Sequence, residues 1–389
     1  MESQNIPISQ KSEQIPPFLV MDVLERAMEM AANGEDVIHL EVGEPDFDTA
    51  DNIIQAGLDA MRAGKTHYTP SIGIPELRRA IASHHLQTYG VEVEPRDVVI
   101  TSGSSPAIFL VLSALLDAGS EIILSDPHYA CYPNFIRFLD GVPVFVPAPA
   151  EDGFQMNPDD VEKAITDKTR AILINSPSNP TGTVMEPERM KRLARLGLPI
   201  ISDEIYHGLV YEGREHSILE FTRNAFVVNG FSKLYAMTGW RLGYLIALPN
   251  HLRPIQKMIQ NFFISPADFV QWAGLEALTN SADHVRKMKE IFNQRRMAMI
   301  SRLKEIGFGI KIDPTAAFYV LADARRFSSD SYKFAFDILE EAGVGVAPGI
   351  DFGSNAEGFI RFSYTNSIEN INIGLDRIEL YLKTRFGRK

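Results

Sequence analysis

The sequence predicts an α/β protein with a large domain, built on a mostly parallel and helix-covered sheet, and a smaller α+β domain. Short apolar runs alternate with helix-like stretches through the middle of the chain, which is typical of parallel strands joined by helices. After residue 252 the pattern becomes helical and then ends in mixed strands and helices. A chain of 389 residues is also too long for one ordinary core.

The segment before the alternation is expected to contain an arm, one strand and three helices. Residues 1–17 are expected to be an extended arm, because three prolines discourage a helix there. Helical spacing predicts a helix over 18–32 that stops at Asn33-Gly34. The other expected elements are a strand over 37–42 and amphipathic helices over 52–62 and 74–89.

The alternating region predicts the large sheet and its covering helices. Strands are expected at 98–100, 122–124, 144–146, 171–174, 199–201, 226–228 and 242–247. Helices between many of them are expected at 107–116, 134–139, 158–165 and 187–196. Ligands of such sheets bind beyond the carboxyl ends of the strands, so polar residues that follow a strand are candidates for a site.

The remaining chain predicts the smaller domain. The expected elements are helices reaching 260 and over 267–278 and 283–306, a strand over 317–321, a helix over 331–342, strands at 344–346 and 359–362, and a helix over 368–384. We expect a large domain at 50–285 and a small domain at 286–389. Residues 1–49 form the arm and part of the small domain, since neither terminal piece carries a complete core alone.

Composition excludes several classes of function. A formal net charge of -12 argues against a surface that neutralises nucleic acid or anionic lipid. Cys131 is the only cysteine, so neither an intrachain disulfide nor a cysteine-rich metal site is expected, and we expect no metal. The first residues lack a signal-peptide pattern and no apolar run is long enough to span a bilayer, so a cytoplasmic protein is expected.

One lysine has a setting that suggests chemistry. Lys233 follows the apolar run at 226–228, directly after Ser232 and shortly before Arg241. Its small and apolar neighbours would partly desolvate the amine, which lowers its pKa and leaves it nucleophilic towards a carbonyl. Ser232 and Arg241 could hold a phosphate beside it. The pattern suggests an aldehyde cofactor that carries a phosphate; a solvated loop lysine near a structural arginine is the alternative.

Two other strand ends offer a phosphate cradle and an aromatic face. Gly103, Ser104 and Ser105 follow the strand at 98–100, and Pro106 suits the first turn of a helix. Hydroxyls and free backbone N–H groups at a helix N-terminus can bind phosphate. Tyr129 follows the strand at 122–124 and could stack on a flat ring.

Two further strand ends carry amides, a carboxylate and a phenol. The loop at 175–182 contains Asn179 and is rich in proline, although a turn whose amides bond the backbone is the alternative reading. Asp203 and Tyr206 follow the strand at 199–201. Together with Lys233, these residue types at one sheet edge match the needs of pyridoxal phosphate.

Seven motifs in order also carry a family resemblance over nearly the whole chain. They are Gly43-Glu44-Pro45-Asp46-Phe47, Tyr68-Thr69-Pro70, Asn175 to Gly182, Ser202-Asp203-Glu204-Ile205-Tyr206, Phe231-Ser232-Lys233, Thr238-Gly239-Trp240-Arg241-Leu242-Gly243 and Arg361-Phe362-Ser363-Tyr364. The chain resembles the class I/II aminotransferases, which are fold-type-I pyridoxal-phosphate enzymes. Within them it is similar to the bacterial aspartate or broad-specificity aminotransferases.

The resemblance implies roles at the cofactor ring. Lys233 would form the internal aldimine and then move the proton between the substrate Cα and C4′ of the cofactor. Asp203 would keep the pyridine nitrogen protonated. Tyr206 and Asn179 would bond the phenolic oxygen, and Tyr129 would stack on the ring.

The resemblance also implies phosphate and substrate sites. The cradle at Gly103, with Ser104, Ser105, Ser232 and Arg241, would hold the phosphate. Tyr68 would reach the phosphate of the neighbouring subunit, which implies a homodimer. Arg361 would bind the substrate α-carboxylate in a bidentate pair, helped by Gly43 and Asn179.

The implied activity is transfer of an amino group from an L-amino acid to a 2-oxo acid by a ping-pong aldimine/ketimine mechanism. A C–S β-lyase on the same scaffold is the alternative. A regulatory domain of a transcription factor is disfavoured by the acidic charge and the missing N-terminal helix-turn-helix. A Rossmann dehydrogenase is disfavoured because no Gly-x-Gly-x-x-Gly follows the first strand. No secure candidate for a second, distal carboxylate-binding arginine is present, which argues against a dicarboxylate-only preference and leaves alanine, aromatic or mixed specificity open, with 2-oxoglutarate as an expected acceptor.

Overall fold

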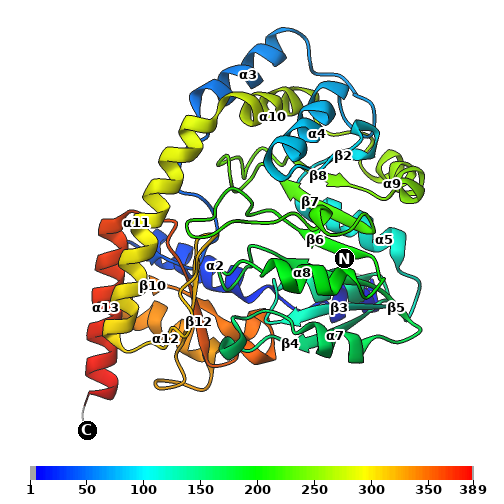
Figure 1. Cartoon of the computed structure of the whole chain (residues 1–389). Helices are drawn as coiled ribbons and strands as arrows, with labels where there is room; N and C mark the ends of the chain where they lie inside the picture. The colour runs from blue at the N-terminus through cyan, green and yellow to red at the C-terminus, as the bar shows by residue number, and fades with distance from the viewer. Residues whose placement is uncertain (1–5, 388–389) are drawn as a thin grey trace.

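The computed structural model describes residues 6–387 and shows two parts built of sheets and helices, joined by a long helix (Figure 1). Within that range the strands form sheets of seven, three and two strands. The largest has the strand order β2-β8-β7-β6-β5-β3-β4. Its strands are β2 (Val98–Thr101), β3 (Glu121–Asp126), β4 (Val142–Pro147), β5 (Thr169–Asn175), β6 (Ile200–Asp203), β7 (Ala225–Gly230) and β8 (Gly243–Ile246). Each lies on a predicted apolar run, and the mostly parallel sheet is confirmed.

Strand β8 is the one reversed strand among those described in this sheet. It pairs antiparallel with β7 on one side and with β2 on the other, whereas β3 to β7 pair in parallel. Gly243, at the start of β8, therefore lies opposite Thr101 and Gly230, at the carboxyl ends of β2 and β7. The loop between the two glycines carries Lys233 and Arg241, so both residues lie at the edge where ligands of α/β proteins bind.

Helices cover both faces of the large sheet. On one face α5 (Ser104–Leu115) and α9 (Pro249–Phe262) pack on buried strand residues such as Val99 and Leu245. Helix α5 is apolar around most of its circumference because it lies between the sheet and α9. The opposite face is covered by α3 (Asp51–Arg62), α4 (Pro75–Tyr89), α7 (Pro158–Ala164), α8 (Pro187–Ala194) and α10 (Asp268–Asn280). Helix α6 (Cys131–Phe138) packs beside β4.

The second part holds the smaller sheets. Strands β9 (Tyr319–Asp323), β12 (Phe359–Ser363) and β11 (Ala347–Pro348) form an antiparallel sheet, and β1 (Ile38–His39) pairs in parallel with β10 (Val344–Gly345). Helices α11 (Ala282–Ile306), α12 (Ser331–Ala342) and α13 (Ile368–Phe386) lie against these sheets. Helix α2 (Leu19–Ala32) buries one face against α12. The N-terminal segment thus packs with the C-terminal one, while the domain boundaries at 49/50 and 285/286 stay a prediction.

The structure departs from the expected elements near the N-terminus. The arm is not extended throughout, because the short helix α1 (Gln10–Gln14) forms there and is capped by Ser9. The prolines flank this helix and do not interrupt it. The strand expected over 37–42 shortens to β1. The Leu40 N–H makes the last backbone hydrogen bond to β10, to Gly345, whereas the Leu40 carbonyl accepts from the backbone of Ser363.

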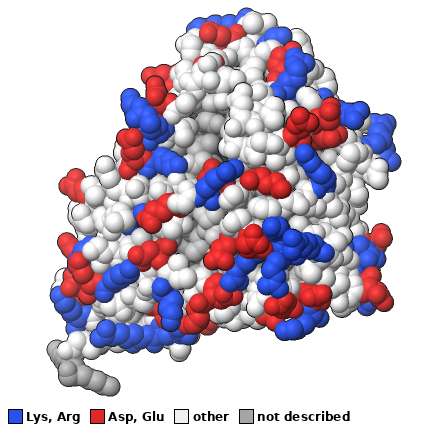
Figure 2. Space-filling view, viewed as in Figure 1, with Lys and Arg blue, Asp and Glu red and all other residues white. Residues whose placement is uncertain are grey.

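The charges on one face of the molecule and the apolar character of the helices can be described together. On the face seen in Figure 2, acidic and basic side chains are interspersed and form no broad patch of one sign. Throughout residues 6–387, no helix has both the length and the apolar character that a membrane crossing requires.

The long helix α11 joins the two parts and is anchored by an ion pair between a buried arginine and a partly buried aspartate. Its 25 residues span about 37 Å. Arg295, near its middle, makes a bidentate pair with Asp46, with N–O distances of 2.6 and 2.9 Å. The guanidinium also lies over the rings of Phe47 and Phe292, at 5.2 and 5.7 Å from their centroids. This pair fixes the turn at residues 43–47 to the helix.

Arg295→Ala should lower the free energy of unfolding by about 2–3 kcal/mol, because Asp46 would lose its partner while it remains partly buried. Thermal unfolding of the apoprotein measures the loss. Arg286→Ala is the control on the same helix, since Arg286 pairs with carboxylates in solvent, and it should leave the midpoint unchanged. Equal midpoints for the two variants would contradict the anchoring role.

Candidate active site

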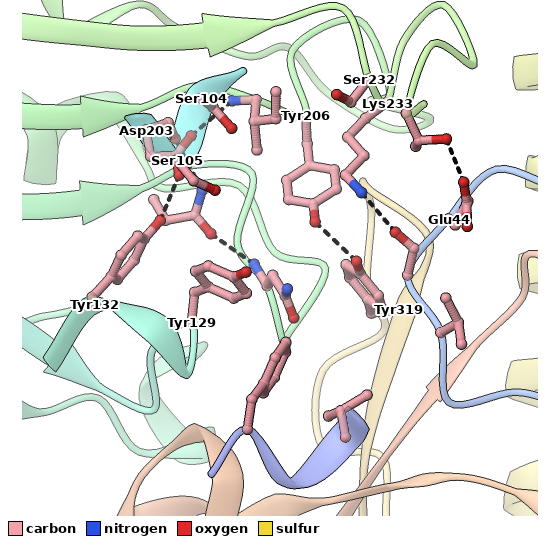
Figure 3. A pocket seen from close by; sticks show the side chains of 18 of the residues that line it. Glu44, Ser104, Ser105, Tyr129, Tyr132, Asp203, Tyr206, Ser232, Lys233 and Tyr319 are labelled. Atoms are coloured by element: carbon pink, nitrogen blue, oxygen red, sulfur yellow. Dashed lines mark hydrogen bonds between the residues drawn. The ribbon is translucent and has the colours of Figure 1, made fainter. Parts of the chain in front are cut away.

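A cavity of about 380 Å³ lies at the carboxyl edge of the large sheet. It gathers most of the predicted site residues from distant parts of the chain (Figure 3). Those that line it are Gly43, Ser104, Ser105, Tyr129, Asn179, Asp203, Tyr206, Ser232, Lys233, Arg241 and Arg361. Gly103 adjoins the cavity, and Tyr68 does not line it. The roles of all these residues stay predictions.

The amine of Lys233 points into the cavity. Its Nζ donates a hydrogen bond of 2.7 Å to the carbonyl oxygen of Gly43 (Figure 3). Burial lowers the pKa of Lys233 to about 8, and the nearby carboxylate of Glu44 offsets only part of this effect. A substantial neutral fraction near neutral pH makes this amine available as a nucleophile and as a proton carrier.

The carboxylate of Asp203 lies at the end of β6, where donors orient it. Tyr132 donates from its hydroxyl to Oδ2 at 2.7 Å, and the backbone N–H of Ile205 donates to Oδ1 at 3.1 Å. Burial nevertheless raises the pKa of Asp203 to about 6. A cationic group bound against this carboxylate would keep it ionised. Tyr132 was not predicted from the sequence.

Tyr206 is held by a residue from the other part of the molecule. Its hydroxyl is hydrogen-bonded to that of Tyr319, on β9, at 2.9 Å, and the two rings meet edge to face (Figure 3). Burial raises the pKa of both phenols, so they are neutral at neutral pH. A Cβ at position 43 would lie 1.9 Å from the Tyr319 hydroxyl oxygen, so this close approach requires Gly43.

Arg361 is a buried guanidinium without a carboxylate partner. Its side chain is 2% exposed and lies between the rings of Tyr319 and Phe352, 4.5 and 4.7 Å from the ring centroids. It donates to Asn179 Oδ1 at 2.9 Å and to the carbonyl oxygen of Glu41. Among residues 6–387 no carboxylate forms an ion pair with it, and its Nε has no hydrogen-bond partner. A buried, fixed and unpaired guanidinium favours an anionic ligand.

The predicted cradle is open to a ligand. Helix α5 starts at Ser104 without a side-chain cap, which leaves its first backbone N–H groups free to bind an anion. Gly103 has φ +105°, and a Cβ there would lie 2.7 Å from Nη2 of Arg241. A Cβ at Gly243 would lie 2.8 Å from the backbone nitrogen of Ser104. The two glycines therefore allow hydroxyls, backbone donors and a guanidinium to converge.

Tyr68 lies away from the cavity of its own chain. Its side chain is 80% exposed, although the adjacent backbone of Thr69 is tied to Ser265 by a hydrogen bond of 3.3 Å. Within this chain Tyr68 therefore has no access to the cradle.

A second buried polar cluster lies behind Asp203. Glu204 Oε1 accepts hydrogen bonds of 3.0 to 3.1 Å from the hydroxyls of Ser202 and Ser217 and the N–H of Ile218. Its Oε2 lies 3.5 Å from Nδ1 of His207. Burial raises the pKa of Glu204 to about 8 and lowers that of His207 to about 4. The pair is therefore neutral at neutral pH, and it ties the end of β6 to the segment at 217–218.

The side chains that line the cavity favour one kind of ligand. The neutral form of the Lys233 amine can add to a carbonyl, and the Asp203 carboxylate can hold a proton on a basic ring nitrogen. Pyridoxal phosphate has both, and its phosphate suits the donors and the close glycine packing of the cradle. Fold and cavity together define a pyridoxal-phosphate enzyme of fold type I.

Comparisons with known proteins assign the family. The chain belongs to the aminotransferase class I and II family, whose profile matches residues 35–378. It is 43% identical over 370 residues to a (5-formylfuran-3-yl)methyl phosphate transaminase of Methanocaldococcus jannaschii, with 94% of this chain and 96% of the relative covered. It is 38% identical over 378 residues to the aspartate/prephenate aminotransferase of Thermus thermophilus, with 95% and 97% covered.

Solved structures agree with this assignment. The aspartate aminotransferase from Thermus thermophilus with maleate superposes with a TM-score of 0.93, at 38% identity, over 97% of this chain and all of that one. A structure from Methanococcus jannaschii, described as similar in its active site to kynurenine aminotransferases, superposes with a TM-score of 0.90, at 41% identity, over 97% of this chain and all of that one. The chain is a pyridoxal-phosphate-dependent aminotransferase, as the motifs predicted.

Sequence reasoning missed several lining residues. Tyr132 lies three positions after Tyr129, and an aromatic residue on that helix gave no signal of its bond to Asp203. Tyr319 lies in the strand expected over 317–321, and this strand pattern gave no signal of its bond to Tyr206. The apolar residues at the start of α2 that line the cavity were predicted only as part of a helix, because hydrophobic spacing does not separate a core face from a cavity wall.

Glu204→Gln should change the pH dependence of stability. The folded chain retains the Glu204 proton up to about pH 8, whereas the unfolded chain releases it near pH 4.3. The free energy of unfolding therefore falls as the pH rises through this window, and glutamine removes that loss. The variant should gain about 2–3 kcal/mol over the native protein at pH 9 and little at pH 4.

Thermal unfolding of both proteins between pH 4 and 9 measures the difference. Glu188→Gln, in the solvent-exposed first turn of α8, is the control and should track the native protein at every pH. A Glu204→Gln curve parallel to the native one would show that Glu204 does not titrate in this window.

Proposed function

We propose that this chain moves an amino group from an L-amino acid to a 2-oxo acid with Lys233, Asp203 and Arg361 as its principal groups. Lys233 carries the proton, Asp203 is the partner of the cofactor ring nitrogen, and Arg361 receives the α-carboxylate of the substrate. The observation that carries this proposal is that all three side chains line one cavity.

The cofactor and Lys233 divide the bond-breaking chemistry. Bound pyridoxal phosphate supplies an aldehyde that couples to amines and a ring that accepts the electron pair left at Cα. Lys233 takes the proton from Cα when its amine is neutral, and burial, which lowers the pKa of this amine to about 8, favours that form. The same amine would then return the proton to C4′ as a general acid.

Asp203 serves the opposite end of the ring. Tyr132 and the backbone of Ile205 hold its two oxygens, so the carboxylate has a fixed direction. It holds a proton on the ring nitrogen, and the resulting positive charge strengthens the ring as an electron acceptor. The neutral state of Glu204, next in the chain, leaves Asp203 as the anion at this position.

Neighbouring groups orient the ring and the substrate. Tyr129 provides a ring face, while Tyr206 donates to the phenolic oxygen from a hydroxyl positioned by Tyr319. Asn179 accepts from Arg361 through Oδ1, which leaves its amide nitrogen as a donor to the phenolic oxygen or the carboxylate. Arg361 binds the α-carboxylate through both terminal nitrogens, and the absence of a side chain at Gly43 lets the Tyr319 hydroxyl approach the backbone there.

We further propose that the protein acts as a homodimer and that Tyr68 completes the phosphate site of the neighbouring copy. Tyr68 is exposed and does not line its own cavity, and Arg241 is exposed at the cradle. The apolar side chains of Phe262, Phe263 and Ile264 are also exposed, directly before Ser265, which holds the backbone beside Tyr68. A second copy seated on this surface would cover them and bring its tyrosine to the phosphate.

Transamination is favoured over C–S β-elimination, because the relatives named above are transaminases. A half-reaction separates the two activities: amino acid alone converts a transaminase to its pyridoxamine form, whereas a lyase releases pyruvate and ammonia. The cytoplasmic location expected from the sequence stays a prediction.

Lys233→Ala should abolish covalent capture of the cofactor. Borohydride reduction of the native holoenzyme is expected to leave one phosphopyridoxyl group on the chain, because reduction fixes the bond between the cofactor and the amine. Intact mass spectrometry measures the adduct. The variant should carry none, and its turnover should fall at least about 100-fold.

Lys257→Ala, an exposed lysine on α9, is the matched control and should capture cofactor as the native chain does. An adduct on Lys233→Ala would assign the cofactor bond to another lysine.

Tyr68→Phe should raise the dissociation constant of pyridoxal phosphate about 10-fold, as expected when one hydrogen bond to a charged group is lost. Light scattering should still report a dimer, because phenylalanine retains the aromatic ring that the proposed interface would cover. Tyr332→Phe, a partly exposed tyrosine on α12, is the control. Absorbance titration of the apoprotein measures the affinity.

A mixed dimer decides whether Tyr68 acts on the neighbouring site. One subunit carries Tyr68→Phe and the other carries Lys233→Ala, so only the first keeps a reactive lysine. The proposal predicts native cofactor affinity at the site of the first subunit, which keeps Lys233. That site would receive the intact Tyr68 of the second subunit. A tenfold weakened site, or a fully active monomer, would contradict it.

A further inference from the structure

One wall of the cavity has no role in the chemistry described above. The start of α2 contributes the side chains of Phe18, Val20, Met21 and Leu24, and α5 adds Ile108. All are apolar. Figure 3 shows this helix below the ring of Tyr129, across the cavity from Lys233. A wall at this place faces the volume left for the side chain of a substrate whose carboxylate is on Arg361 and whose amine is at Lys233.

Contacts from other segments hold this wall in place. Helix α2 has no side-chain cap of its own, and Asp351 supplies one from the C-terminal part of the chain. The two carboxylate oxygens of Asp351 accept the backbone N–H groups of Leu19 and Val20, each at 3.1 Å. The ring of Phe18 meets that of Tyr129 edge to face, with 6.1 Å between centroids. The wall is therefore fixed relative to the residue that covers the cofactor ring.

The cationic side chains that line the cavity already have roles in the proposed function. The lining residues in the described part of the chain include three cations, Lys233, Arg241 and Arg361, and each has a role in the proposed function. The carboxylate of Glu44 also lines the cavity, where it accepts a hydrogen bond from Thr238. A second carboxylate on the substrate would be desolvated against apolar side chains and repelled by Glu44, and the cations that residues 6–387 of this chain contribute to the lining are Lys233, Arg241 and Arg361, each already engaged.

We infer that the amino donor of this enzyme has an uncharged, apolar side chain, aromatic or branched aliphatic, which packs on the α2 wall formed by Phe18, Met21 and Leu24. This inference rests on the proposed function, because it takes the α-carboxylate to be on Arg361. Each methylene buried against the wall strengthens binding about fourfold. Dicarboxylic donors are disfavoured.

Unreactive acids test the class of side chain without turnover. 3-Phenylpropanoate and succinate both offer one carboxylate to Arg361 and differ in the group that meets the wall. Isothermal titration of the holoenzyme should give a dissociation constant for 3-phenylpropanoate at least about 10-fold below that for succinate. Single-turnover conversion of the cofactor spectrum should likewise be faster with phenylalanine and leucine than with aspartate.

A cation placed in the wall should reverse this preference. Met21 is 41% exposed, so an arginine there can keep its charge hydrated while it reaches the cavity. Met21→Arg should shift the ratio of the two dissociation constants at least about 10-fold towards succinate. Met28→Arg is the matched control, because Met28 lies on the same helix, is 59% exposed and does not line the cavity. It should leave the ratio unchanged.

The outcomes of these experiments distinguish a failure of this inference from a failure of the proposed aminotransferase function. Tighter binding of succinate by the native enzyme would overturn the inference and indicate a cation supplied by a second copy of the chain. Equal ratios for Met21→Arg and Met28→Arg would overturn the role of the wall. In both cases capture of the cofactor on Lys233 and its conversion by amino acids would still support the proposed function, which fails only if those are lost.

Discussion

The reversal of β8 is the constraint on which the site depends. Because this strand runs against its neighbours, the loop between Gly230 and Gly243 leaves and re-enters the sheet at one edge. Lys233 and Arg241 therefore share that edge with the ends of β2, β3, β5 and β6. With β8 parallel, the chain would have to cross the sheet before entering it, and Arg241 would lie at the opposite edge from the cradle.

Burial of ionisable side chains is the second organising feature, and its effect on the pKa differs between the groups. It lowers the pKa of Lys233 and raises those of Asp203 and Glu204. Glu204 is neutralised within the fold, whereas Arg361 remains a cation among aromatic rings and without a carboxylate. Within residues 6–387, Lys233, Asp203 and Arg361 bond to neutral groups and lack the oppositely charged partners that would offset the cost of burial. A bound cofactor and substrate would supply these partners, so binding energy rather than folding energy completes the site.

The C-terminal part shapes a cavity whose floor belongs to the large sheet. It contributes Arg361 from β12 and Tyr319 from β9, and Asp351 fixes the first turn of α2. Helix α11 and the Arg295–Asp46 pair hold this part against the turn that contains Gly43. In the proposed function, substrate recognition would depend on contacts between segments separated by more than 300 residues, such as those of Arg361 with Glu41 and of Asp351 with Leu19, while cofactor chemistry would depend mainly on the ends of adjacent strands.

The sequence alone determined the strands, most helices and the residues that follow each strand, because apolar runs and their periodicity are local. Lys233, Asp203 and the Ser104–Ser105 turn could be found in this way, and the ordered motifs added Arg361. The tertiary structure alone decided that Tyr132 orients Asp203, that Tyr319 holds Tyr206, and that Asp351 caps α2. Those pairings join residues 71, 113 and 332 positions apart. No local pattern encodes such a contact, since it exists only once the chain has packed and both side chains have been removed from water.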